Sequence, residues 1–303
     1  MTEARAGNKI LVVGRQGQLA TDLVAAGERM GARLIALGRP ELDITDPDAI
    51  PRALDAHAPA AIINAAAYTA VDRAEGEPEL ALALNRDGPS RLAKACASRE
   101  IALIHVSTDQ VFDGRKRGGY VETDPPNPLC VYGRSKLLGE EAVATGSPEH
   151  LIVRVSWVFG PSGDNFVKKL LAWARERETL AIVSDQRGRP TYGPGLAEAL
   201  LRLACAMTAG EGARPHGLVH LAGASVMARH EQALAVMAGS AARGGPVAAI
   251  RPVPTSDFPT PATRPLNAEL DPTLAGERHG LRLAPFEVDL ATTLDAIIGP
   301  VMG

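Results

Sequence analysis

Cysteine is scarce in this chain. The 303 residues contain three cysteines, which stand far apart and form no CxxC pair: Cys96, Cys130 and Cys205. This number and spacing predict neither a disulfide framework nor a zinc site. His57, His105 and His220 also lack metal-ligand spacing, so we interpret them as structural and predict no metal-binding residues. We therefore expect a protein of the reducing cytoplasm.

A large excess of one charge is also missing, as is any long apolar run. The chain carries 32 Lys and Arg against 35 Asp and Glu, a formal net charge of −3, which predicts no polyanionic partner. The start of the chain, residues 1–9, is polar, and the apolar run 10–13 is too short for a signal-peptide core. No stretch approaches the roughly 20 apolar residues of a membrane span. We expect neither nucleic acid nor a membrane as a partner.

Aromatic residues are few: two Trp, four Tyr and five Phe. The core must therefore consist mostly of Ala, Leu, Val and Ile. Hydrophobic residues make up 46% and charged residues 22% of the chain, which is typical of a globular protein and excludes wholesale disorder. The length fits one large domain or a large and a small one.

Short apolar runs alternate with Ala- and Leu-rich segments in the first half of the chain. Strands are predicted at 9–13, 33–37, 60–64, 102–107 and 151–155, and helices at 19–30, 46–57, 80–99 and 132–145. Continuous apolar strands separated by helices indicate a parallel sheet covered on both faces. The predicted fold class is α/β, a Rossmann-like doubly wound parallel sheet with a smaller C-terminal substrate-binding lobe.

The pattern loosens after residue 157. Helices are predicted at 165–178, 196–209 and 228–238 and a strand at 218–222, while the proline-rich stretch 244–272 is expected to form loops. We expect residues 1–160 to form the nucleotide-binding domain and 161–303 mainly the lobe, with a possible return of the chain to the sheet around 190–222.

A glycine turn follows the first predicted strand directly and opens a helix. Gly14-Arg15-Gln16-Gly17-Gln18-Leu19-Ala20 has the form GxxGxxA. Glycines there permit a tight turn and let a pyrophosphate approach the N–H groups at the helix N-terminus, where the dipole favours negative charge. The alternative is an ordinary strand-to-helix turn that merely uses glycine.

The second predicted strand ends in Gly38-Arg39, where NAD-specific proteins often place an acidic residue on the adenosine ribose. Two guanidinium groups, those of Arg15 and Arg39, would suit a 2′-phosphate, which favours NADPH while leaving NADH possible. Asp43 and Ile44 stand where such a loop can cover adenine. The alternative is that both arginines are solvated surface residues.

A third constellation consists of Thr108, after the fourth strand, and a YxxxK pair, Tyr132 and Lys136. Residues four apart share one helix face. A tyrosine with a pKa of about 10 is a poor acid–base group at neutral pH, and a neighbouring ammonium lowers that pKa. The Thr108 hydroxyl can hydrogen-bond the same substrate oxygen. YxxxK alone occurs by chance on surface helices, but its order after a glycine turn and a Ser-Thr-Asp loop makes the pattern specific.

These motifs resemble the extended short-chain dehydrogenase/reductases and, more closely, the dTDP-4-dehydrorhamnose reductase family. The similar segments span about residues 9–270: NAAAYTAVD (64–72), STDQVFDG (107–114), ETD (122–124), PLCVYGRSKL (128–137), RVSWVF (154–159), DQRGRPT (185–191) and RPLN (264–267). The resemblance implies NADPH-dependent reduction of the 4-keto group of dTDP-4-dehydro-L-rhamnose. It makes Tyr132 the general acid, has Lys136 hold the nicotinamide ribose, and has Thr108 orient the carbonyl.

The resemblance also implies two sets of contacts. Cofactor contacts are expected from Gly14, Arg15, Gln16, Gly17, Gln18, Leu19, Arg39, Asp43, Ile44, Ala65, Ala66, Tyr68, Tyr132 and Lys136. Substrate contacts are expected from Gln110, Val111, Phe112, Trp157, Asn165 and Arg264, although a tryptophan after a strand is as often core packing and a loop arginine is more often solvated.

The chain departs from the family pattern at four positions. Ala20 ends the glycine turn where Gly is usual, Cys130 replaces Asn, Phe286 replaces Trp, and Gln110 replaces the Tyr that borders the sugar in the family. Some relatives also form homodimers through magnesium. Here the candidate carboxylates match no motif, so a solvated acidic tail is favoured over a magnesium site: Glu287, Asp289 and Asp295.

Two other functions share these features. An epimerase or dehydratase of the extended family would carry the same glycine turn and Tyr-Lys pair, and an epimerase would hold NAD tightly without net oxidation of NADPH. A non-catalytic regulatory subunit, like that of methionine adenosyltransferase, also resembles the family. The intact Thr108, Tyr132 and Lys136 favour catalysis.

Overall fold

The computed structural model describes residues 8–209 and 214–301, so the polar segment 1–7 lies outside the described residues. Six parallel strands form the main sheet in the order β10-β5-β4-β3-β1-β2. The strands are β1 (Ile10–Val13), β2 (Leu34–Leu37), β3 (Ala61–Asn64), β4 (Ala102–Thr108), β5 (His150–Val155) and β10 (Gly217–His220). The predicted parallel sheet is confirmed.

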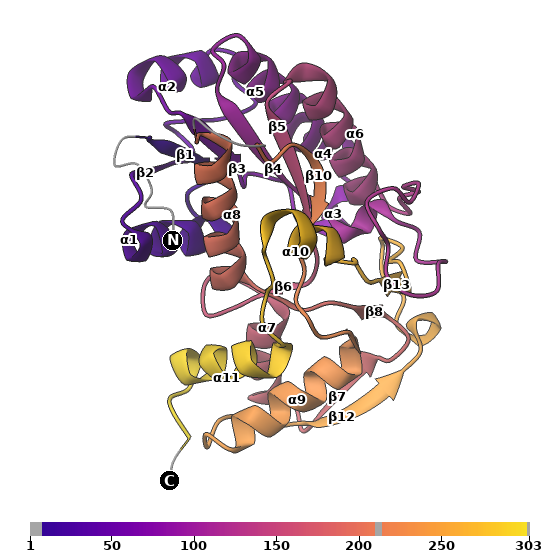
Figure 1. The fold of residues 1–303 in the computed structure, drawn as a ribbon. Helices are drawn as coiled ribbons and strands as arrows, with labels where there is room; N and C mark the ends of the chain where they lie inside the picture. The colour runs from indigo at the N-terminus through magenta and orange to yellow at the C-terminus, as the bar shows by residue number, and fades with distance from the viewer. Residues whose placement is uncertain (1–7, 210–213, 302–303) are drawn as a thin grey trace.

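Helices cover both faces of the sheet (Figure 1). Helices α1 (Gln18–Met30) and α8 (Gly193–Met207) pack on one face, and α2 (Ala49–His57), α5 (Gly88–Ala97) and α6 (Val131–Gly146) cover the other. The strands supply both cores because alternate side chains point to opposite faces. In β1, Ile10 and Val12 join the first core while Leu11 and Val13 join the second.

The helix predicted over 80–99 is confirmed within two residues at each end, but a π-helical turn that was not predicted interrupts its α-helical hydrogen bonding. The chain forms α3 (Val71–Ala74), α4 (Pro78–Leu82), a π-helical turn (Ala83–Asp87) and then α5. Pro89 lies in the first turn of α5, where the missing N–H costs no helical hydrogen bond. The π turn brings the carbonyl of Asn85 against α6, where a Cβ at Gly139 would overlap it. Tertiary contact with α6 therefore shapes this segment.

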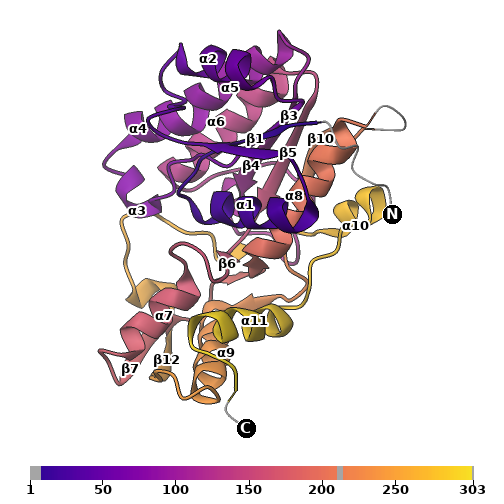
Figure 2. The same cartoon turned by 90° about the vertical axis from the view of Figure 1, so that its left-hand side faces the viewer.

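A third core lies below the sheet in the same view (Figure 1) and stays separate from it in the perpendicular view (Figure 2). It is built by α7 (Phe166–Ala174), β7 (Thr179–Val183), α9 (Arg229–Ala241), β12 (Ala249–Val253) and α11 (Phe286–Ile297). The loops expected over 244–272 are partly wrong, because β12 pairs with β7 in parallel register. That pairing joins segments about 70 residues apart and leaves no local sequence signal.

Short strands connect the two parts. β6 (Val158–Phe159) pairs with β9 (Thr191–Tyr192), and β8 (Arg187–Gly188) lies between β11 (Met227–Ala228) and β13 (Asn267–Ala268); α10 (Thr273–His279) packs near β10. The chain leaves the sheet after β5 and returns to it for α8 and β10. Within residues 8–209 and 214–301, no helix has the length and hydrophobicity needed to span a membrane.

The strand order reverses between β1 and β3, since β1 leads outward to β2 and β3 leads toward β4. In open α/β sheets, ligands bind in the crevice at the carboxyl ends of the strands that flank such a point. The segments that follow β1 and β3 therefore form the first place to look for a site.

Candidate active site

The glycine turn lies at this switch point. Gly14 has a φ of +108°, and a Cβ there would lie 3.3 Å from the backbone nitrogen of Ala66, just after β3. Only glycine combines that backbone conformation with so close an approach. Gly17 caps α1 without a side-chain hydrogen bond, and no atom lies within 4 Å of the Cβ it lacks. Among the described residues, none therefore crowds the side-chain position of Gly17 at the N-terminus of α1.

These residues fit a dinucleotide. The free N–H groups and positive dipole end of α1 suit a pyrophosphate, and the side-chain nitrogen of Gln18 is buried without a hydrogen-bond partner among the described residues. Ala65 and Ala66, both half-buried, form the opposite wall. Leu19 packs inward against the first core, while Gln16 is exposed at the tip of the turn.

The adenosine side of the crevice carries the two arginines. Arg15 is exposed and its Nη1 donates to Glu41 Oε1 at 3.1 Å. Gly38 lets the turn after β2 approach the glycine turn after β1, because a Cβ at Gly38 would lie 2.9 Å from Cβ of Arg15. Arg39 follows and is exposed. Both cations therefore lie at one rim of the crevice.

Asp43 and Ile44 have local roles in the described structure. The carboxylate of Asp43 accepts from the N–H and hydroxyl of Thr45 at 2.9 and 2.7 Å, which lowers its pKa. Ile44 is buried against Gly88, at the start of α5. Asp43 therefore anchors the loop after β2, and Ile44 packs that loop against α5.

Thr108 and Tyr132 meet at the carboxyl end of β4. Thr108 ends β4, Tyr132 lies in the first turn of α6, and both side chains are buried. Burial raises the pKa of Tyr132 above its ordinary value, and a hydrogen bond with the Thr108 side chain acts in the opposite direction. Tyr132 is therefore protonated at neutral pH, the state that a general acid requires.

Lys136 lies one turn along α6 and is 1% exposed. Its Nζ donates to the carbonyl of Val106 at 2.7 Å and lies 3.3 Å from His105 Nε2. Burial lowers the pKa of Lys136 to about 8, and the carboxylate of Glu140 acts in the opposite direction. Lys136 is not among the groups that shift the pKa of Tyr132 here, so its expected pKa-lowering effect has no counterpart in this arrangement.

Buried polar side chains that the sequence analysis missed hold this part of the site. Asn64 Nδ2 lies 3.0 Å from His105 Nδ1, and Asn85 Nδ2 donates to Ser135 Oγ at 2.9 Å. His105 has a strongly lowered pKa because it is buried beside Lys136. One signal could have placed it, since His105 shares its strand face with Leu103, toward the core that α6 covers.

A second feature of the site is the buried carboxylate of Asp109, next to Thr108, with the half-buried cation of Arg229 near it. Asp109 is 4% exposed and accepts from Thr108 Oγ1 at 2.9 Å. Burial raises the pKa of Asp109 to about 7, while Thr108 and the positive charge of Arg229 act in the opposite direction. The Arg229 guanidinium lies 3.4 Å from the ring centroid of Trp157. Sequence reasoning missed Arg229 because it follows Asp109 by 120 positions.

Comparison with known proteins identifies the family. The model of the RmlD substrate binding domain matches residues 8–298. The dTDP-4-dehydrorhamnose reductase of Aggregatibacter actinomycetemcomitans is 40% identical over 282 residues, which cover 92% of this chain and 96% of the relative. The chain belongs to the dTDP-4-dehydrorhamnose reductase family.

Further members agree with this assignment. The dTDP-4-dehydrorhamnose reductase of Escherichia coli K12 is 36% identical, covering 95% of this chain and 97% of that one. The crystal structure of the Bacillus anthracis dTDP-4-dehydrorhamnose reductase, in complex with NADP, has a TM-score of 0.88 at 29% identity and covers 95% of this chain and 98% of its own. A UDP-glucose 4-epimerase from Thermus thermophilus, at 21% identity and a TM-score of 0.78, shares the fold.

Two departures from the family pattern contact each other. The thiol of Cys130 lies 3.6 Å from Gln110 Oε1 and accepts from the N–H of Gly133 at 3.4 Å, which caps α6. Gln110 is half-buried at the mouth of the site. The thiol therefore orients the amide of Gln110 while it caps the helix that carries Tyr132.

Three other residues that were expected to contact the substrate are buried within the chain. Val111 and Phe112 are fully buried, with Phe112 stacked on Tyr120, so they support the loop from beneath rather than line its open side. Asn165 caps α7 and donates to the carbonyl of Gly160 at 2.9 Å, so its amide is used within the chain. A substrate could contact these three side chains only if the surrounding chain moved.

Three further residues have partners of their own. Arg264 makes a bidentate ion pair with Asp72 at 2.7 and 3.0 Å. Trp157 has a φ of +45°, a strained conformation for a bulky residue, and its indole packs against Gly188. The phenol of Tyr68 donates to Glu77 at 2.5 Å.

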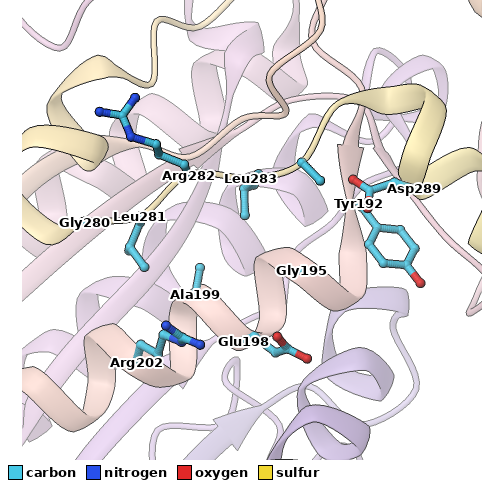
Figure 3. A pocket seen from close by; sticks show the side chains of 11 residues that line it. Tyr192, Gly195, Glu198, Ala199, Arg202, Gly280, Leu281, Arg282, Leu283 and Asp289 are labelled. Carbon is cyan, nitrogen blue, oxygen red and sulfur yellow. The ribbon is translucent and has the colours of Figure 1, made fainter. Parts of the chain in front are cut away.

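A groove lies apart from the catalytic side chains. Figure 3 shows its smaller end, a cavity of about 200 Å³ where Leu281 and Leu283 face α8. Asp22, Glu198 and Asp289 line its continuation, and burial raises the pKa of Asp289 to about 6.

The other two candidate carboxylates do not join Asp289. Asp295 pairs with Arg243 at 2.8 Å, and Glu287 lies 3.2 Å from the hydroxyl of Ser225. Among the described residues, no group of three or more His, Cys, Asp or Glu side chains could hold a metal ion.

Proposed function

We propose that this chain reduces the 4-keto group of dTDP-4-dehydro-L-rhamnose to give dTDP-L-rhamnose, with NADPH as the reductant. The observation that carries the proposal is the buried set of Thr108, Tyr132 and Lys136, beside the crevice opened by the glycine turn. Membership of the family supports the substrate. A protonated Tyr132 supports reduction, since the developing alkoxide needs a proton donor.

The chain's own residues prepare the reaction. Bound NADPH supplies a hydride to C4 of the sugar. Tyr132 gives its phenolic proton to the C4 oxygen, so the hydride and this proton together convert the ketone to an alcohol. Lys136, held by Val106 and His105, binds the ribose next to the nicotinamide. Burial strengthens each of these interactions, because a water-poor site has a low effective dielectric constant.

The preference for NADPH over NADH rests on Arg15 and Arg39. A 2′-phosphate at the adenosine ribose would attract both guanidinium groups, and Arg15 would exchange its exposed partner Glu41 for the phosphate. That exchange costs little, since an exposed ion pair contributes only about 0–1 kcal/mol.

We assign substrate contacts to Gln110, Trp157 and Arg264. Gln110 offers an amide to the sugar and Trp157 a ring face, while Arg264 could turn from Asp72 to the diphosphate. Val111, Phe112 and Asn165 hold the surrounding loops. Cytoplasmic location and a homodimer are further proposals, supported by the three free cysteines and by the family resemblance respectively.

The test is direct. Purified protein is incubated with NADPH and a panel of nucleotide 4-keto sugars, NADPH oxidation is followed, and the products are identified by mass spectrometry. We expect stoichiometric oxidation of NADPH with the dTDP-linked substrate. Interconversion of sugars without oxidation of added NADPH would indicate an epimerase. Absence of both reactions, together with co-purification of a synthetase, would indicate a regulatory subunit.

A further inference from the structure

Asp109 has no role in the mechanism above, yet it is buried at its centre. Its Oδ1 accepts from Thr108 Oγ1 at 2.9 Å, and its Oδ2 is buried without a hydrogen-bond partner among the described residues. A buried carboxylate left partly unsatisfied is costly. Its position next to Thr108 and Tyr132 therefore calls for a function.

Counting donors and acceptors at Thr108 gives that function. A hydroxyl has one proton to donate and two lone pairs that accept. One lone pair of Thr108 Oγ1 accepts from the N–H of Gln110 at 3.2 Å. The remaining lone pair and the proton lie between Asp109 and Tyr132.

Two arrangements satisfy the hydroxyl of Thr108 completely. In the first, Tyr132 donates to Thr108 and Thr108 donates to an ionised Asp109. In the second, a protonated Asp109 donates to Thr108 and Thr108 donates to an ionised Tyr132. The two differ by the transfer of one proton along the chain, with no change in the total number of protons.

We propose that Asp109 is a proton-relay residue that returns a proton to Tyr132 through Thr108 in every turnover. The inference rests on the proposed reductase function. After the O–H bond of Tyr132 breaks to protonate the C4 oxygen, the Thr108 proton forms a new bond to the phenolate oxygen. The proton on Asp109 Oδ1 moves to Thr108, and Asp109 is left as a carboxylate. Solvent restores its proton after the product leaves.

The surroundings of Asp109 suit both of its protonation states. Burial raises its pKa to about 7, so the acid is populated near neutral pH. The charge of Arg229, from α9, stabilises the carboxylate that forms. Burial lowers the pKa of Arg229, and the nearby cation of Arg264 acts in the same direction. An ionised Asp109 raises the pKa of Tyr132, on α6, because two negative charges would repel each other. Only one of the two acids is therefore ionised at a time.

The test compares the first turnover with later ones. Asp109→Asn keeps the size and can still accept from Thr108, but it cannot release a proton. In rapid-mixing experiments we expect the first oxidation of NADPH, which uses the proton already on Tyr132, to stay within about threefold of the wild-type rate. Steady-state kcat should fall by about a hundredfold or more, the lower end of the range for loss of a proton-transfer step. A burst of one NADPH per site should then precede slow turnover.

Matched controls separate a relay from a structural role. Thr108→Ser retains the hydroxyl and should show no such split between first and later turnovers. Wild-type kcat should fall as pH rises through the pKa of Asp109, because the acid form is required, and this limb should be absent in Asp109→Asn. An equal loss in the first and later turnovers, or an unchanged kcat, would overturn the relay.

A measurement on the wild-type protein makes the test independent of turnover. With isotopically labelled aspartate, the infrared carboxylic-acid band of a protonated buried Asp should appear near neutral pH and be missing in Asp109→Asn. Absence of that band in the wild type would also refute the relay. If the wild type reduces no 4-keto sugar, the proposed function fails. The infrared band still shows in that case whether Asp109 is protonated near neutral pH.

Discussion

The buried ion pair between Arg154 and Glu140 joins the catalytic helix to the sheet, and breaking it should destabilise the fold. Arg154, on β5, donates to Glu140, on α6, through Nε at 2.9 Å and Nη2 at 2.6 Å. The two side chains are only 4% and 6% exposed. The guanidinium also lies 5.0 Å from the ring of Phe112 and contacts His220 Nε2 at 3.5 Å. Water cannot replace a lost partner here.

The perturbation is Glu140→Gln, which keeps the shape and one acceptor but removes the charge. Removing one partner of a buried ion pair costs about 3–5 kcal/mol, because the other charge stays buried without compensation. The remaining amide oxygen preserves one hydrogen bond, worth about 0.5–1.5 kcal/mol. We therefore expect the free energy of unfolding to fall by about 3 kcal/mol.

Equilibrium unfolding in urea measures this change. The midpoint should fall at an unchanged m-value, since the surface exposed on unfolding is the same. Glu141→Gln is the matched control: it removes the same charge from the adjacent, exposed position of α6 and should change stability by less than about 0.5 kcal/mol. Replacing both partners, Arg154→Met with Glu140→Leu, should recover part of the loss. A Glu140→Gln protein as stable as the control would refute the reasoning.

Three further predictions concern activity. Tyr132→Phe should lower kcat by about a hundredfold or more, because it removes the proton donor, while NADPH affinity, measured by fluorescence titration, should stay nearly unchanged. Replacing Arg15 and Arg39 by Ala should raise KM for NADPH and leave KM for NADH nearly unchanged, because only NADPH carries the 2′-phosphate; initial rates with each cofactor measure this. Gln110→Tyr should raise kcat/KM for dTDP-4-dehydro-L-rhamnose or narrow the accepted sugars, since it adds an aromatic face; two epimeric 4-keto substrates measure the change.

Each of these has a contradicting outcome. Near-normal turnover of Tyr132→Phe would remove Tyr132 as the acid. An equal rise in KM for both cofactors would show that Arg15 and Arg39 do not recognise the phosphate. An unchanged substrate profile would show that Gln110 does not contact the sugar. Cys130→Ser, which can still cap α6, then tests whether the thiol of Cys130 holds the amide of Gln110 away from the substrate.

Local patterns predicted the nucleotide-binding half of the fold well. The strands β1, β3, β4 and β5 are continuous apolar runs, and the helices between them begin and end within a few residues of their predicted bounds. The predicted helix over 80–99 is present, but its π turn at 83–87 was not predicted, because that turn follows from contact with α6. The pairing of β7 with β12 was missed for the same reason, since each strand needs a partner distant in sequence.

The sequence by itself determined the parallel sheet, the glycine turn and the order of Thr108, Tyr132 and Lys136, because these depend on side-chain periodicity and on residues close together in the chain. Only the tertiary structure decided what surrounds them. It brought His105 to Lys136, Cys130 to Gln110, and Arg229 into the environment of Asp109. Such contacts form when separate elements pack, and burial then sets which side chains carry a proton. Strand periodicity could place His105 on the face toward α6, but it could not name the partner of any of these side chains.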